Sequence, residues 1–172
     1  MKFLKLWLCV AFFFSLYTSG FAQKKTDCKF ETDNTSANGT PIRKIKTKLT
    51  GTDIFYITIT RTDTAYTLGL DFWISGALKE VINKKDVATI KLSGWVNLVL
   101  RASQQVKPNM HYDDQAWSEY TPEYAIRAAD LERLKDTKLL NLKLNVGIEP
   151  FFREFNEKDA EKIMDMVKCI MK

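Results

Sequence analysis

Strict alternation of apolar and polar residues is the feature that most constrains the fold of this chain. Residues 55–60 read FYITIT, and the same alternation recurs in three further stretches, at residues 44–49, 66–74 and 140–146. Successive side chains of an extended strand point to opposite faces, so each stretch has one apolar face and one polar face. Short turns rich in glycine, threonine and aspartate separate the first three stretches. The pattern predicts an antiparallel β-sheet with one buried face.

Two helices are expected beside the sheet. The C-terminal stretch after Asn156 has apolar residues at helical spacing, and Asn156 can cap its first turn. A second, shorter helix ends near Asp136 and has two possible starts. It begins at Pro122, or residues 124–126 form a strand and the helix begins near Ala128, which is the start that we favour. The apolar stripe of the C-terminal helix consists of Ala160, Ile163, Met164, Val167, Ile170 and Met171.

These elements together predict an α+β fold. An antiparallel sheet of about six to eight strands is expected to be packed on one face by the C-terminal amphipathic helix and the short second helix. Residues 103–121 follow neither the strand period nor the helical period. We therefore expect a long loop there, and long loops in compact domains are usually functional or mobile.

The first 22 residues have the composition of a secretory signal peptide. Lys2 and Lys5 precede an apolar run from Leu6 to Leu16, and Gly20-Phe21-Ala22 fits a small-x-small cleavage site. The apolar run is shorter than the roughly 20 residues that a membrane-spanning helix needs. We therefore expect export to the periplasm or the extracellular space.

The mature chain is expected to form one domain. Removal of residues 1–22 leaves 150 residues, and it lowers the net charge from +5 to +3 because it removes two lysines and no acidic residue. This length suffices to bury a core, and so small an excess of positive charge does not indicate nucleic-acid binding. No later stretch is apolar for long enough to span a membrane. Residues 23–40 are polar and predict an extended arm, and residues 41–172 predict a single domain.

The mature chain has two cysteines, Cys28 and Cys169. An exported protein meets an oxidising compartment, and two cysteines allow only one pairing, so we predict a Cys28–Cys169 disulfide. At about 100° per residue, Cys169 lies roughly opposite the apolar stripe of its helix, so we expect it to face outward, where the arm that carries Cys28 crosses the helix. The chain has no C-x-x-C motif, so a structural role is favoured over a redox role.

The order of elements, the FAQ ending of the signal, the cysteine near each terminus and the KCI ending of the helix resemble a set of proteins from Gram-negative bacteria. That set consists of uncharacterised, exported, single-domain α+β proteins. The resemblance implies export to the periplasm or the cell surface. It implies no activity and carries over no functional residues.

The polar faces of the predicted strands provide a candidate binding surface. Aromatic rings among hydrogen-bonding side chains can form a platform for the flat faces of sugars, and a row of lysines suits an anionic polymer. The same lysines can instead protect an edge strand from aggregation, and the tryptophans can form a small second core under the long loop. The candidate residues are Lys44, Lys46, Lys48, Tyr56, Asp71, Trp73, Trp95 and Arg101.

His111 is the one histidine, and it lies near Asp113 and Asp114. A histidine beside carboxylates can take part in acid–base chemistry or bind a metal. However, the sequence has no nucleophile motif, no phosphate-binding loop and no set of zinc ligands. We expect no cofactor and no metal. The favoured function is a non-catalytic, exported binding module for a polysaccharide, an envelope component or a protein. The alternatives are a hydrolase that uses carboxylates with His111, and a structural envelope protein without a defined ligand.

Overall fold

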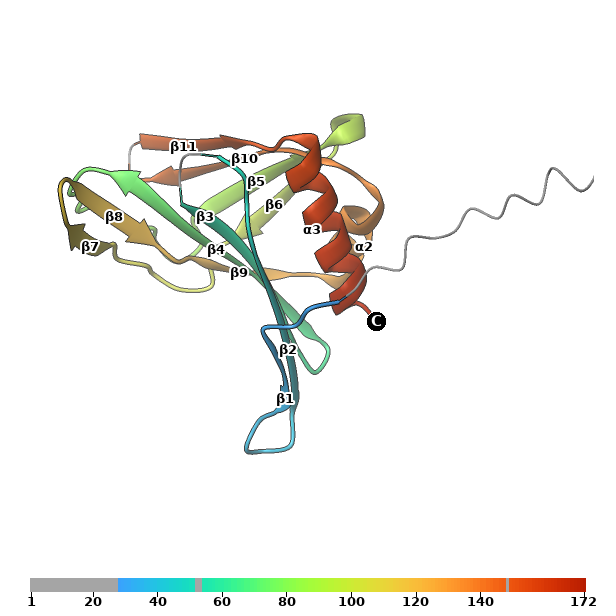
Figure 1. The fold of residues 1–172 in the computed structure, drawn as a ribbon. Coiled ribbons are helices and arrows are strands. Elements are labelled where there is room, and N and C mark those ends of the chain that lie inside the picture. Colours follow the sequence, from blue (N-terminus) through green and yellow to red (C-terminus); the bar gives the residue numbers. More distant parts are fainter. Residues whose placement is uncertain (1–27, 52–53, 148) are drawn as a thin grey trace, which may run out of the picture.

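The computed structural model describes residues 28–51, 54–147 and 149–172 (Figure 1). The predicted signal peptide at residues 1–22 and the first part of the predicted arm lie outside the described residues. Within these ranges the chain is mostly antiparallel β-sheet with two α-helices. The helices are α2 (Ala128–Asp136) and α3 (Glu157–Ile170). The strands are β1 (Thr32–Thr35), β2 (Pro41–Lys48), β3 (Phe55–Thr62), β4 (Ala65–Ser75), β5 (Val87–Leu92), β6 (Asn97–Arg101), β7 (Asn109–Tyr112), β8 (Ala116–Tyr120), β9 (Glu123–Ile126), β10 (Leu139–Val146) and β11 (Glu149–Glu154).

The strands divide between two sheets, whereas the sequence predicted one. The first sheet has the order β1-β2-β3-β4-β8-β7, and β9 also pairs with β4, which makes seven strands. The second sheet has the order β11-β10-β5-β6. The long strand β4 allows this branching because β9 pairs with its residues 66–69 and β8 pairs with its residues 72–75. Alternation shows that a strand has two faces, but it does not show which strands pair.

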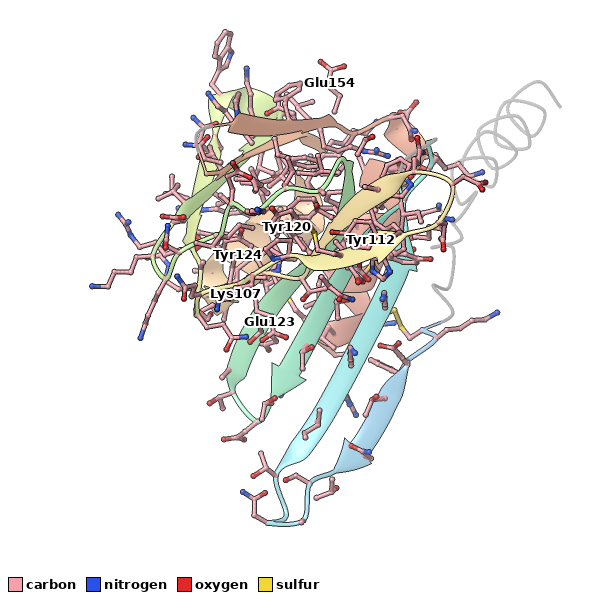
Figure 2. All side chains as sticks on the ribbon, turned by 90° about the vertical axis from the view of Figure 1, so that its left-hand side faces the viewer. Lys107, Tyr112, Tyr120, Glu123, Tyr124 and Glu154 are labelled. Carbon is pink, nitrogen blue, oxygen red and sulfur yellow. A yellow bond between two sulfur atoms is a disulfide. The ribbon has the colours of Figure 1, made fainter. Side chains whose placement is uncertain are left out.

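The core lies on the apolar faces of the strands. Phe55, Ile57 and Ile59 are buried in β3, as the alternation predicted. Figure 2 shows Tyr120 and Tyr124 among the inner side chains, where both are fully buried. The Tyr120 hydroxyl donates a hydrogen bond of 2.9 Å to the backbone oxygen of Glu80. Helix α3 contacts α2, β2 and β3, and its buried residues join the same core.

The predicted loop at residues 103–121 is wrong, because this segment contains the hairpin of β7 and β8. The alternation could not be recognised because β8 has a polar residue, Ser118, on its buried face and an apolar residue, Trp117, on its outer face. Ser118 is fully buried, and its hydroxyl accepts a hydrogen bond from the backbone N–H of Leu78 and donates one to the oxygen of Gly76. The apolar neighbour Trp117 points to the opposite face, so a hydroxyl occupies the position where an apolar residue was expected.

The predicted disulfide between Cys28 and Cys169 is present. The expected position of Cys169 is wrong, however, because its side chain is buried in the core. Cys169 lies at the edge of the helix stripe, and the segment that carries Cys28 packs against the same core and covers it. Met166 is also buried in α3, while the predicted stripe residues Met164 and Met171 are only partly buried.

The structure also decides where the short helix begins and what part of the N-terminal arm does. Residues 123–126 form strand β9 and α2 begins at Ala128, so the favoured alternative is confirmed. The described part of the arm at residues 23–40 contains β1, which pairs with β2 from Thr32 to Thr35. The arm is therefore held by backbone hydrogen bonds as well as by Cys28. Figure 1 shows that β1, β2 and the turn between β3 and β4 project beyond the rest of the fold.

Candidate functional site on the outer sheet face

The polar side chains of the first sheet gather on its outer face, which we define as the face opposite to the core. The strand register aligns Lys48, Tyr56 and Asp71 across β2, β3 and β4. The next row aligns Trp73 of β4 with Glu119 of β8 and Asn109 of β7. Residues aligned in this way have side chains on the same face, so the two rows form one continuous surface.

Trp73, Asn109, His111 and Glu119 form the central group of this face, which we call the Trp73 cluster. The rings of Trp73 and His111 are stacked, with centroids 4.3 Å apart and planes 12° from parallel. Nε2 of His111 lies 2.8 Å from a carboxylate oxygen of Glu119, and Nδ2 of Asn109 donates to the same oxygen at 3.1 Å. The cluster is thus a flat aromatic pair beside a carboxylate that accepts several hydrogen bonds.

The surroundings of Glu119 keep its side chain ionised. Partial burial works to raise the pKa of Glu119, but the hydrogen bonds from His111, Asn109 and Trp73 outweigh it. The pKa of Glu119 is therefore lower than its ordinary value. An ionised carboxylate only accepts hydrogen bonds, so Nε2 of His111 carries the proton that lies between the two groups. Nδ1 of His111 has no hydrogen-bond partner in the described part of the chain.

Lys46, Tyr56 and Asp71 form a second group beside the cluster. Nζ of Lys46 lies 2.9 Å from Oδ2 of Asp71 and 4.4 Å from the centroid of the Tyr56 ring. The hydrogen bond to Asp71 outweighs the effect of burial and raises the pKa of Lys46. Oδ1 of Asp71 is buried and has no hydrogen-bond partner among the residues that the structure describes. The outer face therefore combines the ammonium of Lys46, which is paired with Asp71, with the aromatic rings of Tyr56 and of the Trp73 cluster.

The structure brings together most of the residues that the sequence singled out, but not all of them. Lys46, Tyr56, Asp71 and Trp73 lie on the outer face, and Lys44 and Lys48 flank them on β2. Lys44 forms an ion pair of 3.0 Å with Glu31, and Lys48 lies 5.9 Å from the centroid of the Tyr56 ring.

Trp95 and Arg101 are not part of this surface, because Arg101 is in β6 of the second sheet and Trp95 is in the turn that joins β5 to β6. Trp95 lies in the short 3-10 turn Ser93–Trp95 between β5 and β6, where its side chain is 90% exposed and Nζ of Lys91 lies 5.4 Å from its ring centroid. Arg101 is exposed at the end of β6. The prediction that they share one face with Trp73 is wrong, because it rested on a single sheet and the strands form two.

Three residues of the face were missed by sequence reasoning: Asn109, Trp117 and Glu119. All three lie in the segment that was expected to be a loop. The spacing of Trp117 and Glu119 by two residues is a strand signal, and it was obscured by the buried polar Ser118 between them. His111 was identified from the sequence, but its carboxylate partner is Glu119 rather than Asp113 or Asp114, both of which are exposed.

Neither a metal site, nor a membrane-spanning helix, nor a known relative points to a function for the described part of the chain. Within residues 28–51, 54–147 and 149–172, no group of three or more histidine, cysteine, aspartate or glutamate side chains could hold a metal ion. No helix in that same part of the chain is long and apolar enough to cross a membrane. Comparison with protein-family models, with curated proteins and with solved structures finds no match to this chain.

Proposed function

We propose that this protein is an exported, non-catalytic binding module that holds a carbohydrate chain on the outer face of its first sheet. The observation that carries the proposal is the Trp73 cluster, a stacked pair of flat rings with an ionised carboxylate and an amide beside it. Such a surface offers both an apolar plane for sugar ring faces and acceptors for sugar hydroxyls. The disulfide between Cys28 and Cys169 supports export, because disulfides persist in oxidising compartments.

The polar groups of the cluster are already positioned without a ligand. Glu119 holds Trp73, His111 and Asn109 by hydrogen bonds, so these side chains lose little freedom when a ligand binds. Nδ1 of His111 has no hydrogen-bond partner in the described part of the chain and is available to a ligand hydroxyl. His111 and Glu119 keep 29% and 21% of their side-chain surface exposed, which leaves them within reach of a ligand. Preorganised and partly exposed polar groups of this kind favour recognition.

The charge state of Glu119 argues against glycoside hydrolysis. A glycosidase needs one carboxyl group that is protonated near neutral pH, which requires a raised pKa. The pKa of Glu119 is lowered instead, and the carboxylate accepts hydrogen bonds that a general acid would have to give up. The nearby hydroxyl of Ser118 is on the buried side of β8 and is engaged in other hydrogen bonds, so it cannot serve His111 as a nucleophile.

A hydrolase remains the second candidate because one observation favours it. The 2.8 Å contact between His111 and Glu119 is the arrangement in which a carboxylate orients a histidine base. If this pair is catalytic, replacement of His111 with alanine abolishes turnover of a substrate while binding is kept. If the face only binds, the same change weakens binding and no turnover is found with the wild-type protein.

The deciding experiment is a glycan screen of the oxidised protein (residues 23–172), followed by titration calorimetry of the best ligand with three variants. Trp73→Ala removes the central ring, and Trp73→Phe keeps an aromatic plane without the indole N–H. Trp95→Ala is the matched control, because it removes an equally large ring from an exposed site on the other sheet. Loss of the buried contact area predicts a Kd at least about tenfold weaker for Trp73→Ala, and a change of less than about twofold for Trp95→Ala.

Three results contradict the proposal. A screen in which no glycan binds turns attention to a protein partner. Equal losses for the Trp73 and Trp95 variants show that the outer face is not the site. Release of reducing ends by the wild-type protein favours the hydrolase.

A further inference from the structure

A hollow lies on the core side of the projecting strands, on the opposite face of the first sheet from the Trp73 cluster. It has a volume of about 300 Å³ and is lined by Pro41, Arg43, Arg61 and Lys172. Arg43 is two residues from the buried Ile45 in β2, so its side chain is on the core face of the sheet, just beyond the end of the core. Lys172 brings the end of the chain after α3 to the same place, and Figure 1 shows this end beside the projecting strands.

The lining of the hollow is strongly cationic. Arg43 forms one ion pair of 3.2 Å, with Asp33 on the neighbouring strand. Arg61 donates from Nε to the backbone oxygen of Asp63, and Nζ of Lys172 lies 3.8 Å from Sγ of Cys28. Neither Arg61 nor Lys172 has an ion pair with a carboxylate among the described residues. Of these three basic side chains, only Arg43 forms an ion pair with a carboxylate side chain in the described part of the chain.

The placement of the two arginines has an energetic cost for the protein alone. Arg43 and Arg61 are directly opposite each other in the pairing of β2 with β3. Like charges at directly opposed positions destabilise a sheet. The arrangement is nevertheless held in place, because Arg43 lies 5.6 Å from the centroid of the Phe30 ring and Arg61 lies 5.8 Å from that of the Tyr66 ring. These contacts fix the two guanidinium groups before a ligand arrives.

We propose that this hollow binds the oxyanion group of a small organic ligand. Carboxylate, sulfate and phosphate groups share the chemistry that two fixed guanidinium groups and an ammonium recognise. An anion between the opposed arginines removes their mutual repulsion, so binding relieves the strain that the unliganded protein carries. A volume of about 300 Å³ accommodates a ligand of the size of one sugar ring, at the lower limit of ordinary ligand sites. This site is independent of the carbohydrate face proposed above.

The test compares four probes that differ in charge and size: glucose, glucuronate, glucose 6-phosphate and inorganic phosphate. Titration calorimetry at low and at physiological salt measures their affinity for the oxidised protein and for two variants. Arg61→Gln removes the arginine that has no carboxylate partner, and Arg101→Gln is the matched control on the second sheet. Loss of a charge-assisted contact predicts affinity about 10- to 100-fold weaker for Arg61→Gln. Affinity for the charged sugars should exceed that for glucose by about tenfold or more and should fall as salt rises.

The pattern of binding among the probes identifies the source of the anion and can overturn the proposal. Tighter binding of the charged sugars than of inorganic phosphate supports an organic ligand, whereas equal binding of the two overturns that part and leaves an inorganic ion site. Equal affinity for glucose and glucuronate, or equal losses for Arg61→Gln and Arg101→Gln, overturns the site altogether.

The melting temperature of unliganded Arg61→Gln is a second measurement. It distinguishes a binding role of Arg61 from a purely structural one. Arg61→Gln removes the repulsion from Arg43 but also the contacts of Arg61 with Asp63 and Tyr66, so the melting temperature of the unliganded protein should change little. A clear fall in this temperature shows that Arg61 is retained for stability, and it contradicts the proposal even if binding is also lost.

Discussion

Removal of the disulfide between Cys28 and Cys169 should strongly destabilise the protein. The two cysteines are separated by 141 residues, so the bond closes almost the whole described chain into one loop. Loop-closure entropy for this length gives a stabilisation of about 5 kcal/mol at 25 °C. Native contacts should change little, since β1 stays paired with β2 through four residue pairs when the bond is absent. The effect should therefore arise mainly in the unfolded state.

The magnitude can be checked by thermal and urea unfolding of the oxidised protein and of Cys28→Ala. A loss of about 5 kcal/mol corresponds to a fall of roughly 10–20 °C in melting temperature for a domain of this size. Cys28→Ala keeps the sulfur of Cys169 in the core, so it measures the loss of the crosslink without creating a cavity there. The double variant, in which Cys169 is also alanine, adds the cost of a small cavity, about 1 kcal/mol.

Two results would refute this reasoning. A fall of less than about 3 °C for Cys28→Ala would mean that the unfolded chain is not restrained as loop-closure entropy assumes. Loss of hydrogen-exchange protection throughout β1 in that variant would mean that the disulfide holds the arm in the native state. The stabilisation would then be a native-state effect rather than an entropic one.

Three further predictions concern single side chains. Burial works to raise the pKa of Glu119, but its hydrogen bonds lower the pKa below the ordinary value. The carboxylate therefore stabilises the folded protein above its unfolded pKa, and this stabilisation is lost as pH falls through the lower folded pKa. In urea unfolding, the difference in free energy of unfolding between wild type and Glu119→Gln should be constant above about pH 5 and should shrink below about pH 4. A difference that is the same at every pH would contradict this. Asp159 is buried and accepts hydrogen bonds of 2.9 and 2.7 Å from the backbone N–H and hydroxyl of Thr50, so Asp159→Ala should cost about 2–4 kcal/mol, measured by urea unfolding, with Thr50→Ala as the milder control. Ser118→Ala should lower the free energy of unfolding by about 1–3 kcal/mol, because a buried backbone N–H loses its acceptor, and a neutral effect would show that the backbone finds another partner.

The outer face illustrates how far the site could be predicted. Tyr56, Asp71 and Trp73 were identified because they occupy polar-face positions of strands whose alternation is clear. His111 was identified as the one histidine, but its stacking on Trp73 could not be predicted. That contact depends on the pairing of β4 with β8 and of β8 with β7, which brings residues 73 and 111 to the same face.

The sequence by itself determined two things: the direction of side chains within a strand, and the pairing of the two cysteines. The inward positions of Phe55, Ile57 and Ile59 follow from the two-residue period of an extended backbone. The disulfide follows from there being only two cysteines outside the predicted signal.

The tertiary structure alone decided which segments lie beside each other. It divided the strands between two sheets, separated Trp95 and Arg101 from Trp73, and placed Arg43 opposite Arg61 at the end of the core. The physical reason is that alternation fixes the two faces of each strand, whereas strand order and register depend on pairing between distant segments. No period within a single segment encodes that pairing.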